Sequence, residues 1–245
     1  MESARDGDGA HAADGARAEK HVNEDEMQRW VAVEKGMLSR VLYPNPVCLL
    51  TARDTETDKR NVMTITWLTP INNQGGFICS MNRNRHSARF VNKVGAVFVL
   101  NVPVEGMESL VLSIGGCSGS TVDKFTEFAI ATCAPGGDSA SIERDTDHPS
   151  QRKKQKLSKQ ELHREVVREA AAQSVALRDC VAHVLSRVER IDEDDGHLIL
   201  RCTQLAAWCR APYWDGKTFL PRRRDIPAYL TFVGSQVFAS VRPHQ

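Results

Sequence analysis

The sequence of 245 residues has almost no net charge, because its 32 lysines and arginines are balanced by 31 aspartates and glutamates. A net charge of +1 creates no overall field that would attract nucleic acid or an anionic membrane. No stretch approaches the roughly 18 consecutive apolar residues that a transmembrane helix needs. We therefore expect neither nucleic acid nor a membrane as a partner, and an anionic ligand would have to bind at a local site.

Paired cysteine motifs are also missing. The seven cysteines form no C-x-x-C, their number is odd, and most lie in apolar runs such as PVCLLTA (46–52). This pattern is typical of reduced, buried thiols and not of disulfides or a metal site. The first residues have no apolar core, so we expect no signal or transit peptide. The expected location is the cytoplasm, and no metal is expected.

The common catalytic fingerprints are absent too. The small-residue stretch IGGCSGSTVDKF (114–125) is neither a dinucleotide-binding G-x-G-x-x-G nor a Walker motif. No G-x-S-x-G elbow of a hydrolase occurs. His183 and His197 lack a diagnostic metal spacing, and no histidine stands in a sequence relation to Cys117.

What is present is a series of short strands with few helices. Strands are predicted within 46–53, 61–71, 75–82 and 96–103, and a hairpin joins 178–192 to 197–209 through the turn EDDG. Helices are predicted over 24–42, 85–95 and 106–114, the second with Ala88, Val91 and Val94 on one face. This rhythm indicates an all-β barrel or sandwich with peripheral helices.

Two segments stand apart from this pattern. Residues 1–24 have no periodicity and are predicted to be a disordered tail. Residues 135–173 are strongly polar and are interpreted as a charged insertion, because so long a connection is unusual inside a compact domain. Its first half is predicted to be a disordered loop, and its second half a helix that begins with a capping box at Ser158 and Glu161.

Three polar clusters are candidates for a binding site. In NVMTITW (61–67), alternation puts Thr64 and Thr66 on one face of a strand, where either solvent or a ligand meets their hydroxyls. In SMNRNRHSARF (80–90), a strand end meets a helix start among three arginines, which suits a phosphate; the alternative is a simple helix cap with solvated arginines. The small-residue stretch 114–125 is either a tight turn or a place where a flat ligand approaches the backbone.

In this order and spacing, the clusters resemble the flavin reductase-like family. The resemblance rests on N-x-x-T-x-T-W at 61–67, the serine that opens the helix before VFVLNV, and SG…DKF at 118–125. It implies an all-β, Greek-key FMN-binding split barrel with peripheral helices, formed by residues 25–245 as a single domain. It also implies a homodimer.

The resemblance further implies the residues of a flavin site. Asn61, Thr64, Thr66 and Trp67 would line the isoalloxazine ring, with Met63 and Ile65 pointing into the barrel. The remaining matches are the phosphate segment and the later motifs: Ser80, Asn82, Arg85 and Ser87 for the phosphate, then Asn101, Ser118, Asp123, Lys124 and Phe125, with His197 on the nicotinamide side as the catalytic candidate.

The implied activity is NAD(P)H-dependent reduction of FMN, with FAD as the alternative flavin and either NADH or NADPH as co-substrate. After His197 the family usually has a glycine and an acid, which LILRCTQL (198–205) lacks. This departure favours a first alternative, an FMN-binding electron-transfer protein with little NAD(P)H turnover. A second alternative is a barrel without flavin that serves as an interaction module.

Overall fold

The computed structural model describes residues 29–137 and 158–243. The chain divides into two compact units, residues 1–38 and 39–245, and the barrel and its pockets lie entirely in the second. The predicted tail and the first half of the predicted insertion lie outside the described residues, apart from 135–137. The predicted domain organisation stays a prediction.

The central feature is a curled antiparallel sheet. Within the described residues it has seven strands in the order β3-β2-β6-β9-β10-β5-β4. Their bounds are β2 Cys48–Arg53, β3 Arg60–Ile65, β4 Leu68–Pro70, β5 Gly76–Asn82, β6 Val97–Val102, β9 Ala182–Asp194 and β10 His197–Cys209. The edge strands β3 and β4 are consecutive in the chain, and only Thr66 and Trp67 separate them. The sheet must therefore curl until its two edges approach each other, as in a split barrel.

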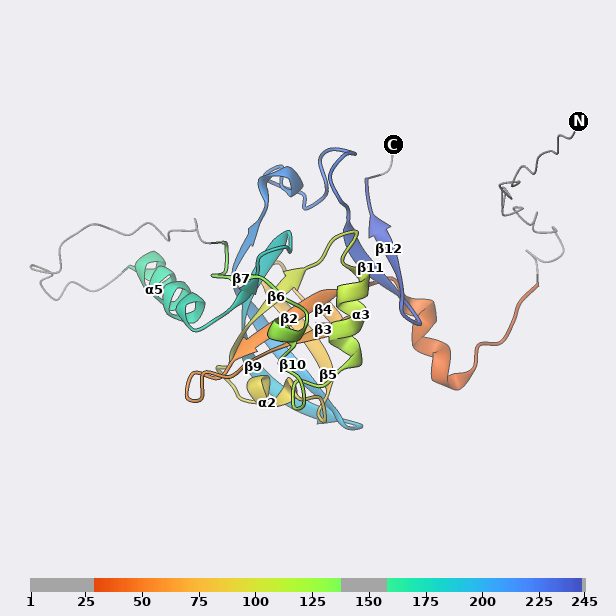
Figure 1. Ribbon diagram of the computed structural model, residues 1–245, viewed down its shortest axis with the longest axis horizontal. Coiled ribbons are helices and arrows are strands. Elements are labelled where there is room, and N and C mark those ends of the chain that lie inside the picture. Colours follow the sequence, from red (N-terminus) through yellow and green to blue (C-terminus); the bar gives the residue numbers. More distant parts are fainter. Residues whose placement is uncertain (1–28, 138–157, 244–245) are drawn as a thin grey trace, which may run out of the picture. The chain divides into compact units, whose positions relative to one another are not determined.

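Apolar alternation explains which face of β3 lies inside. Met63 and Ile65 belong to the cluster that fills the barrel, together with Phe98 and Leu200. Val62 points to the other side and packs under the helix α3 (Glu108–Gly116), beside Val111 and Ile114. Figure 1 shows α3 beside β3. The predicted inward orientation of Met63 and Ile65 is confirmed.

The smaller elements cover the barrel or join its strands. Within the described residues, a second sheet has the order β1-β11-β12 (Asn45–Pro46, Tyr229–Gly234, Val237–Val241), and a third pairs β7 (Thr132–Cys133) with β8 (Ala176–Leu177). The remaining helices are η1 Lys35–Leu42, α2 Ala88–Val91, α4 Lys124–Glu127, α5 Lys159–Ala172 and η2 Ala211–Tyr213.

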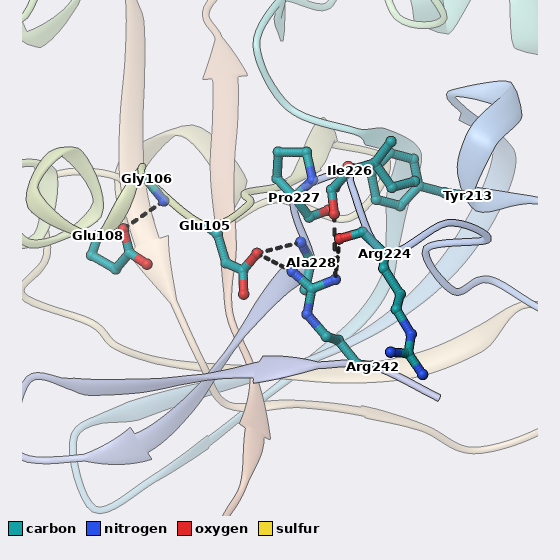
Figure 2. A network of polar contacts seen from close by, with 9 residues as sticks. All are labelled: Glu105, Gly106, Glu108, Tyr213, Arg224, Ile226, Pro227, Ala228 and Arg242. Carbon is teal, nitrogen blue, oxygen red and sulfur yellow. Dashed lines mark hydrogen bonds and ion pairs between the residues drawn. The ribbon is translucent and has the colours of Figure 1, made fainter. Parts of the chain in front are cut away.

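A polar network attaches the C-terminal sheet to the turn before α3 (Figure 2). The carboxylate of Glu105 accepts hydrogen bonds from the backbone N–H of Ala228 at 2.8 Å and from the guanidinium of Arg242 at 2.5 Å. Arg242 also donates to the carbonyl of Ile226, and the hydroxyl of Tyr213 donates to that of Pro227 at 2.6 Å. These bonds fix the position of β11 and β12, which reach the pocket described below.

Most predicted elements are confirmed. The strands within 46–103, the hairpin β9–β10 with its turn at Asp195 and Gly196, and the helix α3 are present. The strand expected over 61–71 is divided into β3 and β4, because the chain leaves one edge of the sheet at Thr66 and Trp67 and joins the other. Helix α5 begins with the predicted capping box between Ser158 and Glu161. The cysteines, which all lie in described segments, form no disulfide; Cys48, Cys79, Cys180 and Cys202 are buried as predicted.

Two predicted helices are wrong in extent. The helix expected over 85–95 is the single turn α2, and Val94 is 61% exposed where it was expected on the buried face. The helix ends at Val91 because Asn92, with a φ of −78° and a ψ of 51°, has already left the helical conformation. In place of the helix expected over 24–42, η1 begins only at Lys35 as a 3-10 helix, with no buried residue to anchor an amphipathic face. Residues 24–28 lie outside the described part.

Candidate functional site

The two threonines of NVMTITW have different environments. The hydroxyl of Thr64 donates to the carbonyl oxygen of Val111 in α3 at 2.6 Å. Neither solvent nor a ligand is needed to satisfy this donor. Thr66 lies past the end of β3, and its hydroxyl makes no hydrogen bond within the described part of the chain. Of the two, Thr66 is the one that offers a free hydroxyl.

Thr64 and Thr66 line a pocket of about 660 Å³, the main pocket. This volume lies in the range of small-molecule and cofactor sites, about 300–1,000 Å³. The walls come from the end of β3, the segment before α2, the C-terminal end of α3 with the loop after it, and the hairpin β11–β12. The residues that line it include Asn61, Thr64, Thr66, Arg85, His86, Ser87, Leu112, Ser118, Gly119, Lys124, Phe232, Gln236 and Phe238.

Two cations face the main pocket from different elements. Arg85 is exposed, and its guanidinium has no hydrogen bond or ion pair within residues 29–137 and 158–243. Lys124 is buried, and its ammonium donates to the carbonyl of Ile114 near the end of α3 at 2.7 Å. Burial lowers the pKa of Lys124; Cys117 acts in the opposite direction, and Arg85 lowers the pKa further. An anionic group in the pocket would relieve both effects on this buried ammonium.

The loop after α3 approaches the start of β3 very closely. A Cβ placed on Gly119 would lie 2.1 Å from the amide oxygen of Asn61, so only glycine fits there without a shift. The buried amide of Asn61 donates to the hydroxyl of Ser87 at 2.7 Å. Ser87 therefore supports the wall of the pocket through Asn61, and does not cap α2 with its side chain. The N-terminus of so short a helix also adds little to a phosphate site.

A second hollow of about 160 Å³, the seam hollow, adjoins the main pocket where β3 gives way to β4. Both share Thr64, Thr66 and Arg85, and the seam hollow adds Trp67, Ser80, Asn82 and His197. The rings of Trp67 and His197 stack at 5.3 Å, and Trp67 donates to the hydroxyl of Tyr43 at 3.3 Å. This aromatic pair lines the seam hollow, and it includes His197, the residue that the family resemblance implies for the nicotinamide side.

Three predicted site residues lie outside both hollows. Asn101 is fully buried; its amide donates to the carbonyl of Leu49 at 2.7 Å and accepts from the backbone N–H of Leu177 at 2.8 Å. Phe125 is buried beneath the guanidinium of Arg60, 4.2 Å from the ring centre. The carboxylate of Asp123 caps α4 by accepting from the N–H of Phe125 and the hydroxyl of Thr126, and the Thr126 bond is the largest cause of its lowered pKa.

The hairpin β11–β12 contributes residues that sequence reasoning missed. Phe232, Gln236 and Phe238 line the main pocket, and the rings of Phe232 and Phe238 lie 5.8 Å apart. A signal was present, because YLTFV and VFASV are apolar-rich runs on either side of a Gly-Ser-Gln turn.

Within the described residues, no cluster of histidine, cysteine and carboxylate side chains could bind a metal ion, and no helix is long and apolar enough to cross a membrane.

Comparison with known proteins agrees with this geometry. Residues 38–144 match the family model of the flavin reductase like domain. This match, over less than half of the chain, confirms the resemblance seen in the sequence. No curated protein matches the chain at the level of sequence.

Solved structures of similar fold include three flavin proteins. Flavoredoxin from Methanosarcina acetivorans superposes with a TM-score of 0.61 at 16% identity, over 89% of this chain and 94% of that one. An FMN-binding protein from Thermus thermophilus with bound 1-cyclohex-2-enone gives 0.58 at 16% identity, over 89% and 96%. An NADH:FAD oxidoreductase from Streptomyces globisporus gives 0.56 at 14% identity, over 89% and 100%. The fold is therefore an all-β split barrel, as predicted, and the domain match together with these neighbours supports a flavin-related function.

Proposed function

We propose that the main pocket binds a flavin mononucleotide unit and that the protein is an NAD(P)H-dependent flavin reductase. The observation that carries this proposal is the pairing of two cations, Arg85 and the buried Lys124, with an apolar wall in one pocket of a flavin reductase-like domain. A phosphate needs cationic donors, and an isoalloxazine ring needs apolar cover with a few polar partners. The donor set of this pocket fits both parts.

Each part of the site has a distinct task in this proposal. Arg85 binds the phosphate at the junction of the two hollows, with Ser80 and Asn82 nearby in the seam hollow. Thr66 offers a hydroxyl to the polar edge of the ring, while Phe232 and Phe238 cover apolar surface. Asn61 and Ser87 maintain the wall by their mutual hydrogen bond, and Ser118 exposes a hydroxyl at the rim. Asp123 positions Lys124 by capping the helix that begins with it.

A flavin held in the main pocket would supply the redox chemistry, by accepting a hydride (one proton with two electrons) from a nicotinamide donor. The chain supplies binding and orientation. Trp67 and His197 present a stacked aromatic surface at the edge of the seam hollow, against which a nicotinamide ring can lie. The buried ammonium of Lys124 stabilises negative charge in the pocket without a proton transfer.

The test has two stages. Purified protein is titrated with FMN and with FAD while the absorbance and fluorescence of the flavin are followed. Oxidation of NADH and of NADPH is then measured in the presence of each flavin. The proposal predicts flavin binding and turnover with at least one nicotinamide. Absence of any flavin binding would overturn it and favour an interaction module.

A second candidate function, electron transfer with little NAD(P)H turnover, has one observation in its favour. After His197 the strand β10 carries Leu198, Leu200 and Cys202 into the barrel core, where they are buried. Of the described residues of β10, His197 alone lines the seam hollow. Flavin binding without oxidation of NADH or NADPH would support this second function.

The homodimer implied by the resemblance is a further proposal, which light scattering of the purified protein tests.

A further inference from the structure

A third hollow, of about 510 Å³, lies beyond the loop that follows α3. It is called the basic cleft here. It is formed by the turn between β2 and β3 (58–60), by the side chains of Arg89 and Phe90 on α2, and by the loop 119–123. Three of its residues were described above: His86 and Gly119 also line the main pocket, and Asp123 caps α4. The other residues of the basic cleft have no part in the proposed flavin site.

The charges of the basic cleft are unbalanced. Its two acids already have partners: Asp58 pairs with Arg53, and Asp123 caps α4. Its cations are much less engaged. Within the described part of the chain, Lys59 makes no hydrogen bond or ion pair, and Arg89 faces the ring of Phe90 at 5.8 Å and acts electrostatically on the carboxylate of Asp54 without a hydrogen bond to it. The third cation, Arg60, lies over the ring of Phe125 and reaches the hydroxyl of Thr132 at 3.5 Å, so it is not counted among the available charges. An anion entering the cleft would meet cations without displacing an existing ion pair, which lowers the cost of binding it.

The basic cleft adjoins the main pocket. His86 and Gly119 line both hollows, and Gly119 presents bare backbone at this boundary because the amide of Asn61 leaves no space for a Cβ. The pKa of His86 is lowered mainly by burial, and to a smaller extent by the charges of Arg89, Lys124 and Lys59. Cations of both hollows therefore act on the residue between them. A ligand that extends from one hollow past His86 would enter the other.

We infer that the basic cleft binds a second phosphate group of a nucleotide whose other part lies in the main pocket. The inference rests on the proposed function. Two ligands carry this chemistry: FAD, through the phosphate that joins its adenosine half, and NADPH, through its 2′-phosphate. Lys59 and Arg89 are the groups that contact the phosphate, Lys59 as a point charge and Arg89 through its planar guanidinium.

The experiment removes these two charges with the double variant Lys59→Met, Arg89→Met. The matched control, Arg201→Met, Lys217→Met, removes the same charge from exposed positions that do not line the cleft. Affinities for FMN, FAD, NADH and NADPH are measured by fluorescence titration, and affinity for ADP by calorimetry. All four side chains are exposed, so both variants should fold; circular dichroism checks this.

If the inference is right, the cleft variant loses roughly tenfold in affinity either for FAD together with ADP, or for NADPH, while FMN and NADH bind as in wild type. A loss confined to FAD assigns the cleft to the flavin, and a loss confined to NADPH assigns it to the electron donor. Equal affinities in the cleft variant and the control, for ADP and for every nucleotide, would overturn the inference. If ADP binding depends on the cleft but no flavin binds, the proposed function fails and the phosphate site stands.

Discussion

Replacing Arg85 by methionine should weaken the binding of FMN far more than that of riboflavin. The reason is that Arg85 lines both the main pocket and the seam hollow without a hydrogen-bond or ion-pair partner in the described residues. Methionine keeps a side chain of similar length and removes only the guanidinium. Arg83 supplies the matched control, since it is also exposed but is paired with Glu193 and lines neither hollow.

The expected magnitude follows from the exposure of Arg85. A hydrogen bond to a charged group contributes about 1.5–3 kcal/mol, and solvent screening at an exposed site reduces this to about 1–2 kcal/mol. Such a loss corresponds to roughly five- to thirtyfold weaker binding of FMN. Raising the salt concentration should narrow the difference between wild type and Arg85→Met, because exposed charges are screened.

The assay is a titration in which the quenching of flavin fluorescence is followed for wild type, Arg85→Met and Arg83→Met. Riboflavin has the ring but no phosphate, so its affinity should be the same in all three proteins. The reasoning is refuted if Arg85→Met binds FMN as wild type does, or if it loses riboflavin to the same degree. Ser87 should not be changed together with Arg85, because its loss would leave the buried amide of Asn61 without its acceptor.

Three further predictions concern residues around the site. Asn101→Ala should lower the free energy of unfolding by about 1–3 kcal/mol for each buried group left without a partner, with flavin affinity of the folded protein unchanged; urea unfolding and titration check this. Lys124→Met should weaken FMN binding but change the free energy of unfolding by no more than about 1 kcal/mol, because burial already disfavours this ammonium; FMN titration and urea unfolding measure the two. Glu105→Gln should reduce the acid sensitivity of stability: the pKa of Glu105 is lowered by the Ser240 hydroxyl, then by the Ala228 N–H and Arg242, so the carboxylate stabilises the fold above its unfolded pKa of 4.5 and this contribution is lost as the pH falls below it. Urea midpoints at neutral and acidic pH should therefore differ less in Glu105→Gln than in wild type.

The barrel strands were predictable because their patterns are local. Alternation places Met63 and Ile65 inside, and the turn residues Asp195 and Gly196 with positive φ mark the long hairpin. The predicted site residues Asn61, Thr66, Arg85, Ser118 and Lys124 meet in one pocket although more than sixty positions separate the first from the last. Their order along the chain carried the prediction through the family resemblance, and no single motif would have done so.

Contacts between distant segments explain what could not be predicted. Nothing near Thr64 indicates that its hydroxyl donates to Val111, and nothing near Asn101 indicates that Leu177 donates to its amide. The helix over 85–95 was overestimated because its apolar spacing continues to Val94, whereas the backbone leaves the helical conformation at Asn92. Phe232 and Phe238 were missed because no strand was predicted after residue 209, although the strands β11 and β12 that carry them line the pocket.

The central claim is that the main pocket binds a flavin, and the most direct measurement is the absorbance spectrum of the purified protein after incubation with FMN and removal of unbound ligand. The account predicts a retained flavin spectrum, with one flavin for each folded chain, and predicts that Arg85→Met retains less. A colourless wild-type protein after this treatment, with FMN and with FAD, would contradict the account.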